Sequence, residues 1–279
     1  MMISRRNFLA VAGAAAAAAA LTACGGSSSS TSTASSTASS AASSEAASTS
    51  AAAELTTVEA GKLTMATNAT FPPYEMTTDS GEIEGIDVDT AKAIAEKLGL
   101  ELQIDDMEFD AALLSVQQGK ADIVMAGVTV TDERKAVMDF SDSYATGIQS
   151  IIVPNDSDIA SPDDLAGKKI GTQRGTTGYI YCSDDFGDDA VVAYDNGLTA
   201  VQALNNGQVD AVVIDNAPAK EYVAANPGLA ILDTSYAEED YAIGMAKGSS
   251  LEDAVNAALE ELKADGTLQS IVDKYITAE

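Results

Sequence analysis

From residue 63 onward, short apolar runs alternate with helical segments, and this alternation constrains the fold more than any other feature of the chain. The apolar runs predict strands at 63–66, 100–104, 122–126, 169–171, 191–194 and 211–214. The segments between them predict helices at 87–98, 111–118, 198–205, 217–225 and 251–264, the first of which is stopped by Gly99. Strands that alternate with helices form α/β layers with largely parallel sheets. We therefore expect an α/β protein.

Two segments of the chain share one local pattern. Leu113–Ala126 and Val201–Ile214 each contain the end of a helix, a glycine, two further residues, an aspartate and an apolar strand. The copies end at Ala126–Gly127 and at Asp215, which are the carboxyl ends of the two strands. Ligands of open α/β sheets gather at such ends. Although any α/β protein contains helix–strand units, the pair is compatible with two lobes that each present one strand end to a shared cleft.

The first 24 residues predict a signal peptide. A charge-free apolar run at 8–23 follows two arginines and is too short for a permanent membrane-spanning helix. The segment Ser4-Arg5-Arg6-Asn7-Phe8-Leu9 resembles a twin-arginine export signal, but two arginines also fit the general secretory route, so both routes stay open. Leu21-Thr22-Ala23-Cys24 resembles a bacterial lipobox, which implies a lipid on Cys24. We expect an exported chain, anchored by this lipid at the cell surface or in the periplasm.

Residues 25–54 are rich in Ser, Ala and Thr, and the charged residues among them are Glu45 and Glu54. Such a segment buries too little apolar surface to fold, so we expect a disordered linker that holds the folded part away from the membrane. The remaining residues, 55–279, are numerous enough for two modest domains with proper cores.

The composition excludes several classes of function. The chain has no histidine, which removes the commonest general base and disfavours a zinc site. It has only two cysteines, Cys24 and Cys182, so a lipid on Cys24 would rule out an intrachain disulfide. Cys182 is expected to be a small apolar residue on a helix. A net charge of −28 without a basic cluster argues against nucleic acid. We expect no metal, no cofactor and no catalysis.

Six motifs then carry a resemblance to a known family. They are Met65–Glu75, Gly85–Asp89, Ala126–Arg134, Met138–Ser141, Gly175–Gly178 and Asp210–Asp215. In this order, within about 63–275, they resemble the amino-acid-binding proteins of ABC transporters, the solute-binding proteins of family 3. The resemblance implies a monomer that binds a polar amino acid and delivers it to a membrane permease with its ATPase subunits.

The resemblance also implies a two-lobed periplasmic-binding-protein fold of type II with two crossover hinge strands. Lobe 1 is expected at 55–145 and 241–279, and lobe 2 at 149–237. The hinges are expected near 144–149 and 237–241. Closure of the lobes on the ligand would complete the site.

Arg134 is the candidate for the ligand carboxylate, because a guanidinium offers a fixed pair of donors that matches a carboxylate. The resemblance implies this role for Arg134, with Thr129 and Thr177 assisting through backbone or hydroxyl donors. A helix that begins near Gly178 could add its amino-terminal dipole. The alternative is an arginine on a surface helix that pairs with Asp132 or Glu133.

Asp215 is the candidate for the ligand ammonium. It follows an apolar run, and a carboxylate buried there without a partner would be destabilising. The resemblance implies that the carbonyl of Ala126 or Gly127 helps to bind the ammonium. As an alternative or additional role, Asp215 could cap the helix predicted at 217–225.

The resemblance implies that Asn68, Phe71, Phe109 and, with less support, Gln173 line the pocket for the ligand side chain. Phe71 and Phe109 would enclose its aliphatic part, although Phe109 could equally belong to the core. Some relatives that bind cationic amino acids carry an acid at the position of Asn68. A neutral Asn68 suits an amide or another polar end group, and it leaves Lys and Arg open as ligands because acids elsewhere could serve.

Two other functions remain open. Some relatives with this fold are secreted cyclohexadienyl dehydratases, which need a general acid in the cleft. A surface sensor or adhesin that binds an amino acid as a signal would have the same site as a transport protein.

Overall fold

The computed structural model describes residues 55–276. The predicted signal peptide 1–24, with Cys24, and the predicted linker 25–54 lie outside these residues. Among the helices that are described, none is both long and apolar enough to cross a membrane.

The first lobe is built on a five-stranded sheet in the order β5-β1-β6-β14-β7. Its strands are β1 (Lys62–Thr67), β5 (Glu101–Asp106), β6 (Ile123–Val124), β7 (Met138–Phe140) and β14 (Gly244–Ala246). β1 runs parallel to β5 and β6, whereas β14 is antiparallel to β6 and β7. The sheet therefore joins two segments that are more than a hundred residues apart in the sequence.

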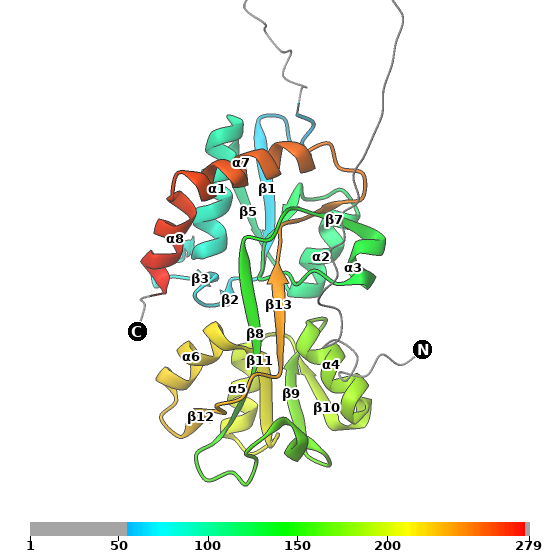
Figure 1. Ribbon diagram of the computed structural model, residues 1–279, viewed down its shortest axis with the longest axis vertical. Helices are drawn as coiled ribbons and strands as arrows, with labels where there is room; N and C mark the ends of the chain where they lie inside the picture. The colour runs from blue at the N-terminus through cyan, green and yellow to red at the C-terminus, as the bar shows by residue number, and fades with distance from the viewer. Residues whose placement is uncertain (1–54, 277–279) are drawn as a thin grey trace, which may run out of the picture. The chain divides into compact units, whose positions relative to one another are not determined.

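Helices cover both faces of this sheet (Figure 1). α1 (Ile86–Leu98), α7 (Glu252–Ala264) and α8 (Thr267–Tyr275) pack together on one face, and α2 (Phe109–Gln117) packs against β1, β6 and β14. The short α3 (Asp132–Val137) precedes β7. A small antiparallel sheet of β2 (Thr70–Phe71), β3 (Glu75–Thr77) and β4 (Ile83–Glu84) leads into α1.

The second lobe is built on a six-stranded sheet in the order β10-β9-β11-β8-β12, with β13 also paired to β8. The strands are β8 (Ala145–Pro154), β9 (Ile170–Gln173), β10 (Val191–Tyr194), β11 (Ala211–Asp215), β12 (Leu229–Ile231) and β13 (Ala237–Tyr241). The helices are α4 (Thr177–Phe186), α5 (Gly197–Asn205) and α6 (Asn216–Ala225), with short 3₁₀ turns at Pro162–Leu165 and Asp188–Ala190.

Two antiparallel strands, β8 and β13, connect the lobes (Figure 1). Gly147 on β8 is required here because Tyr241 of β13 lies over it. A Cβ atom at position 147 would lie 2.4 Å from the Tyr241 ring. The two crossover strands are thus paired side by side and packed closely at the point where the chain passes between the lobes.

The two-lobed α/β fold with two crossover strands confirms the fold predicted from the sequence. The sheets are mixed rather than largely parallel, because the crossover strand β8 and the returning strand β14 enter them in the opposite direction. The strand predicted at 122–126 is shorter, at Ile123–Val124. The 3₁₀ turn at Pro162–Leu165 begins with a capping box formed by Ser161 and Asp164. The pattern did not predict α8, which is only nine residues long.

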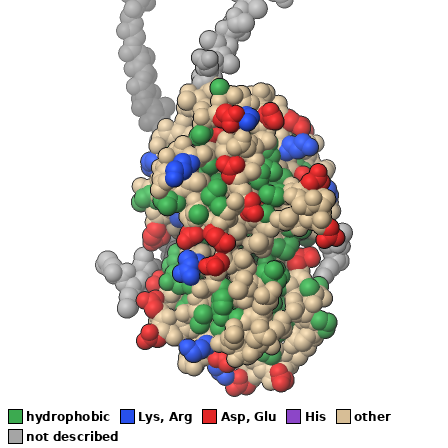
Figure 2. Space-filling view, turned by 180° about the vertical axis from the view of Figure 1, so that it is seen from behind, with side chains coloured by type: hydrophobic (Ala, Val, Ile, Leu, Met, Phe, Trp, Pro, Cys, Tyr) green, Lys and Arg blue, Asp and Glu red, His purple; other side chains and the backbone are tan. Residues whose placement is uncertain are grey.

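The surface agrees with the acidic composition. Figure 2 shows acidic side chains in the upper and the lower part of one face, and the Lys and Arg side chains there form no continuous stripe. This distribution favours solubility over the binding of a polyanion.

Candidate functional site

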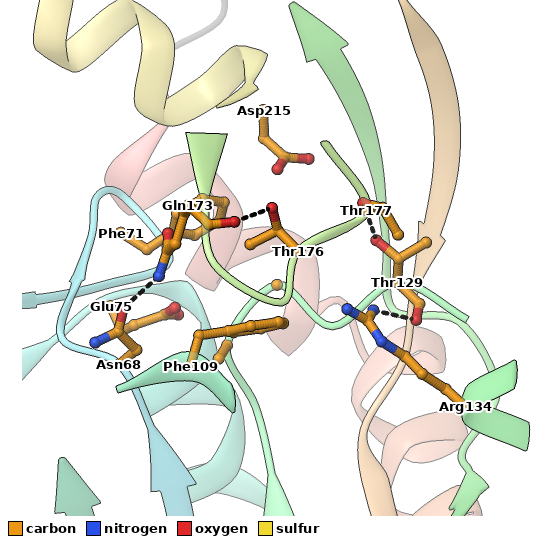
Figure 3. Close-up of a pocket in the computed structure, with 12 residues that line it drawn as sticks. Asn68, Phe71, Glu75, Phe109, Thr129, Arg134, Gln173, Thr176, Thr177 and Asp215 are labelled. Carbon is orange, nitrogen blue, oxygen red and sulfur yellow. Dashed lines mark hydrogen bonds between the residues drawn. The ribbon is translucent and has the colours of Figure 1, made fainter. Parts of the chain in front are cut away.

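A small cavity lies where the two lobes meet, and all ten residues predicted to bind a ligand line it (Figure 3). Lobe 1 contributes Asn68, Phe71, Phe109, Ala126, Gly127, Thr129 and Arg134; lobe 2 contributes Gln173, Thr177 and Asp215. The cavity volume is about 20 Å³, which is room for about one water molecule. The lobes are therefore closed tightly on each other.

The two repeated helix–strand units bring their carboxyl ends to this cavity. Ala126 and Gly127 follow β6, and Asp215 ends β11. Gly127 has a φ of 56°, its N–H donates to Asp87 Oδ2 at 3.0 Å, and a Cβ atom there would lie 2.7 Å from the Phe71 ring. Glycine is therefore required at this position by both conformation and space.

Arg134 lies in the cavity rather than on a solvated helix surface. α3 begins after Thr131, whose hydroxyl accepts from the Arg134 backbone N–H at 3.1 Å. The Arg134 side chain turns inward: Nη1 donates to the Thr129 carbonyl at 2.7 Å, and Nη2 donates to the Gly175 carbonyl of the other lobe at 3.2 Å. Its guanidinium carbon lies 5.4 Å from the centre of the Phe109 ring. Burial lowers the pKa of Arg134, and the carboxylates of Glu239 and Asp215 act in the opposite direction.

Asp215 is buried at the end of β11 and points into the cavity (Figure 3). Gln149 Nε2 donates to its Oδ2 at 2.9 Å, and the Tyr241 hydroxyl donates to Oδ1. Burial, with a further contribution from Glu239, raises the pKa of Asp215 to about 7. Its side chain makes no capping bond to α6, so the capping alternative is wrong.

Thr129 and Thr177 face each other across the lobe boundary, with their hydroxyl oxygens 3.5 Å apart. Both hydroxyls donate to the same oxygen, Glu239 Oε2, at 3.1 Å and 3.0 Å. Gln149 Nε2 also donates to that oxygen, at 3.0 Å. Glu239 thus lies at the centre of a hydrogen-bond cluster that joins both lobes.

At the opposite end of the cavity, Asn68 and Gln173 meet across the lobes. Gln173 Nε2 donates to Asn68 Oδ1 at 2.9 Å, and Asn68 Nδ2 donates to the Met107 carbonyl at 2.9 Å. Phe71 lies beside them and stacks on Tyr74 with ring centres 5.8 Å apart. Tyr74 is buried and lines the neighbouring groove beside Tyr241.

Glu75 belongs to the same end and was not predicted as a site residue. It is 0 % exposed, and neither carboxylate oxygen accepts a hydrogen bond from the described residues, whereas a protonated Glu75 can share its proton with the neighbouring Asp87. Burial and the nearby carboxylate of Asp87 raise its pKa well above the usual range. A buried carboxylate that accepts no hydrogen bond is unfavourable for folding.

Sequence reasoning also missed Thr176 and Glu239. Thr176 lines the cavity and caps α4, accepting from the Tyr179 N–H. Glu239 lies within the acidic run Glu238-Glu239-Asp240, which is typical of a solvated segment. The alternation of side chains along a strand could have identified Glu239. Ala237, Glu239 and Tyr241 share one face of β13, and the last two are buried.

Within residues 55–276, no three or more His, Cys, Asp or Glu side chains are arranged to hold a metal ion. Cys182 is buried on α4, in the core of lobe 2, and does not reach the cavity.

Comparison with protein families gives two matches along the chain. Residues 63–278 match the bacterial extracellular solute-binding proteins, family 3. Residues 2–22 match the signal sequence of the twin-arginine translocation pathway, which supports export and favours this route over the general secretory one.

Individual relatives cover most of the chain. The L-cystine-binding protein TcyJ of Escherichia coli (strain K12) is 33% identical, over 79% of this chain and 85% of its own. The arginine-binding extracellular protein ArtP of Bacillus subtilis (strain 168) is 34% identical, over 78% of this chain and 87% of its own. Among solved structures, the arginine-, lysine-, histidine-binding protein ArtJ of Geobacillus stearothermophilus is 35% identical with a TM-score of 0.75, covering 78% of this chain and 96% of its own.

Proposed function

The chain belongs to the bacterial extracellular solute-binding proteins of family 3, and from this premise we propose that it binds a cationic amino acid between its lobes. Arginine is the first candidate. The protein would deliver this amino acid to the permease of an ABC importer and would catalyse no reaction.

Glu75 is the observation that carries the choice of a cation. Its buried carboxylate accepts no hydrogen bond from the part of the chain that the structure describes, and it lies at the end of the cavity away from Thr129 and Arg134. A guanidinium or ammonium group on the ligand side chain would supply both a counter-charge and hydrogen-bond donors. A ligand with an apolar end would leave the carboxylate as it is, so it would gain nothing from this contact.

Asn68 is neutral, and its side chain is bonded within the protein. One N–H of its Nδ2 donates to the Met107 carbonyl, and its Oδ1 accepts from Gln173 Nε2 and from the Thr70 hydroxyl. The neutral residue at position 68 is thus compatible with a cationic ligand, because Glu75 is the acid that lies elsewhere.

The other end of the cavity suits the part that all amino acids share. Arg134 uses two donors within the protein, and a guanidinium has five, so three remain for the ligand carboxylate. The N–H groups in the first turn of α4 lack helical partners and can add to this binding. Asp215 and the carbonyl of Ala126 or Gly127 would bind the ammonium.

Entry of the ligand requires the lobes to separate, because the closed cavity holds only about 20 Å³. We take lobe 1 as 55–145 and 241–279 and lobe 2 as 149–237, with hinges in β8 and β13. Separation would break the bonds from Gln173 to Asn68 and from Arg134 to Gly175. The ligand would restore closure by joining groups of both lobes, which shifts the population toward the closed form.

The front of the chain completes the proposal. Residues 2–22 would direct export, a lipid on Cys24 would anchor the mature chain, and residues 25–54 would act as a tether. The protein would then work as a monomer beside its permease and ATPase subunits.

A thermal-shift screen against the twenty amino acids tests this function, because a ligand that binds only the native state raises the melting temperature. We expect the largest rise with arginine and a much smaller one with citrulline, its neutral analogue of similar shape. If no amino acid raises the melting temperature, the proposal is wrong.

A raised pKa on Glu75 is also what a dehydratase would need in a general acid. The screen is therefore accompanied by a turnover assay with prephenate and arogenate. Product formation would replace the binding role with a catalytic one.

A further inference from the structure

Glu239 is a buried acid of the closed molecule, and the contacts proposed above for the ligand's carboxylate and ammonium do not include it. It lies in the crossover strand β13, and 6% of its surface is exposed. Its neighbours Glu238 and Asp240 are both exposed. One of its oxygens, Oε2, receives three donors, which come from Thr129 of lobe 1, Thr177 at the start of α4, and Gln149 of β8.

The chemistry of these groups sets the direction of each hydrogen bond. A carboxylate oxygen can only accept, whereas a threonine hydroxyl has one proton to donate and two lone pairs to accept with. Two hydroxyls at 3.1 Å and 3.0 Å from Glu239 Oε2 must therefore both direct their protons at it. Neither hydroxyl retains a proton for the cavity, so each can offer only lone pairs to a ligand.

We propose that Glu239 is a positioning residue that turns the hydroxyls of Thr129 and Thr177 into acceptors for the ligand's ammonium group. The inference deepens the proposed function and rests on it. The ammonium is then surrounded by acceptors, namely Asp215, a backbone carbonyl and the hydroxyl oxygens. The ligand carboxylate takes its donors from Arg134 and from backbone N–H groups, not from these hydroxyls.

The same carboxylate links the ammonium site to closure. Thr129 and Thr177 belong to different lobes, so both can reach Glu239 only when the lobes are together. Gln149 Nε2 donates to Glu239 and also to Asp215, which ties the two carboxylates to one amide. Glu239 therefore holds the acceptor arrangement only in the closed molecule, where the ligand is enclosed.

Glu239→Gln is the informative substitution, because it preserves shape and replaces one acceptor oxygen by an NH₂ donor. The remaining amide oxygen is neutral and holds the two hydroxyl protons less firmly than a carboxylate does, and where the NH₂ group faces the threonines at least one hydroxyl must accept. In both orientations a hydroxyl proton becomes available to the cavity, where it opposes an ammonium. The matched control is Glu238→Gln, which removes the same charge one residue away on the exposed face of β13.

The test is calorimetric titration of the native chain and both variants with arginine and with desamino-arginine, which lacks only the ammonium. We expect Glu239→Gln to weaken the binding of arginine about 10- to 100-fold, as for loss of a hydrogen bond to a charged group. The affinity for desamino-arginine should change less than about threefold. Glu238→Gln should change the affinity for either ligand by no more than that. Equal weakening of both ligands by Glu239→Gln, or no weakening of arginine, would overturn the inference.

A second measurement needs no ligand, and so separates this inference from the proposed function. If the native chain fails to bind arginine at all, the proposed function is what fails. Thermal unfolding of Glu239→Gln, Thr177→Val and the double variant still tests the contact between hydroxyl and carboxylate. We expect the double variant to lose less stability than the two single variants lose together, because each single substitution removes the same hydrogen bond. Additive losses would show that Thr177 does not donate to Glu239.

Discussion

The two ends of the cavity each contain a buried acid, but the protein treats these acids differently. Asp215 accepts from Gln149 and Tyr241, and its pKa is raised to about 7. Glu75 accepts no hydrogen bond, and its pKa is raised well above the usual range. Both shifts have burial as their main cause, so the difference between the ends lies in the hydrogen-bond donors that each acid receives.

This difference indicates that the two ends serve different parts of the ligand. The end around Arg134 and Asp215, called here the organised end, has hydrogen-bond partners within the closed protein, which suits groups that every amino acid carries. The end around Glu75 lacks donors of its own and depends on the ligand for them. We therefore expect changes at the first end to weaken all amino acids, and changes at the second end to alter which amino acid is preferred.

The largest effect is expected from Arg134→Ala. It removes the guanidinium that lines the organised end, so the ligand carboxylate loses its partner in a buried place, at a cost of roughly 3–5 kcal/mol. Calorimetry should show this loss for every amino acid that the native chain binds. A loss below tenfold would place the carboxylate elsewhere.

The second largest effect is expected from Asp215→Asn, which should weaken the binding of every amino acid that the native chain binds. Removing one member of a buried charge pair weakens binding by roughly 2–4 kcal/mol. The fold should be retained, because an amide can still accept from Gln149 or Tyr241. Desamino-arginine provides the control, and the assignment fails if the native chain binds it as tightly as arginine.

Glu75→Gln should change selectivity rather than binding in general. The affinity for arginine should fall by about 10- to 100-fold, whereas the affinity for citrulline should be retained or increased. Competition calorimetry with both ligands measures the change in the ratio of the two affinities. If both ligands weaken equally, Glu75 is not the group that selects the cation.

The same variant should stabilise the ligand-free protein. Because folding raises the pKa of Glu75, the penalty of its buried charge is absent at low pH and grows as the pH rises above the unfolded value of about 4.5. Glu75→Gln should therefore raise the melting temperature at pH 7.5, by about 2–4 °C for each kcal/mol relieved, and have little effect at pH 4. A lower melting temperature at pH 7.5 would show that the carboxylate has protein partners.

The smallest effect is a pH dependence of binding at the organised end. Asp215 has a pKa of about 7 in the ligand-free protein, and an ammonium pairs with its ionised form. Affinity should thus fall as the pH falls below about 7, by up to about tenfold per pH unit for one group. Asp215→Asn should flatten this slope between pH 6 and 7, although Asp87, with a pKa of about 6, can contribute below that range. A slope unchanged in Asp215→Asn would assign the proton to another residue.

Much of this molecule could be read from local sequence. The alternation of strands and helices predicts the α/β class, since each element is encoded by its own apolar period. The helix–glycine–aspartate–strand pattern placed Ala126 and Asp215 at strand ends, and the structure brings both ends to one cavity. The twin arginines at the front of the chain likewise carry their export signal in consecutive residues.

Only the tertiary structure decided which acids lie inside and what they contact. Glu239 and its exposed neighbour Glu238 are identical in type, and their difference arises from the pairing of β13 with β8, nearly a hundred residues earlier. Glu75 is buried but accepts no hydrogen bond from the described residues, whereas Asp215, at the end of β11, accepts from Gln149 and Tyr241 of the two crossover strands. Burial and hydrogen-bond partners are set by contacts between remote segments, whereas the local period of a sequence reports only the element to which a residue belongs.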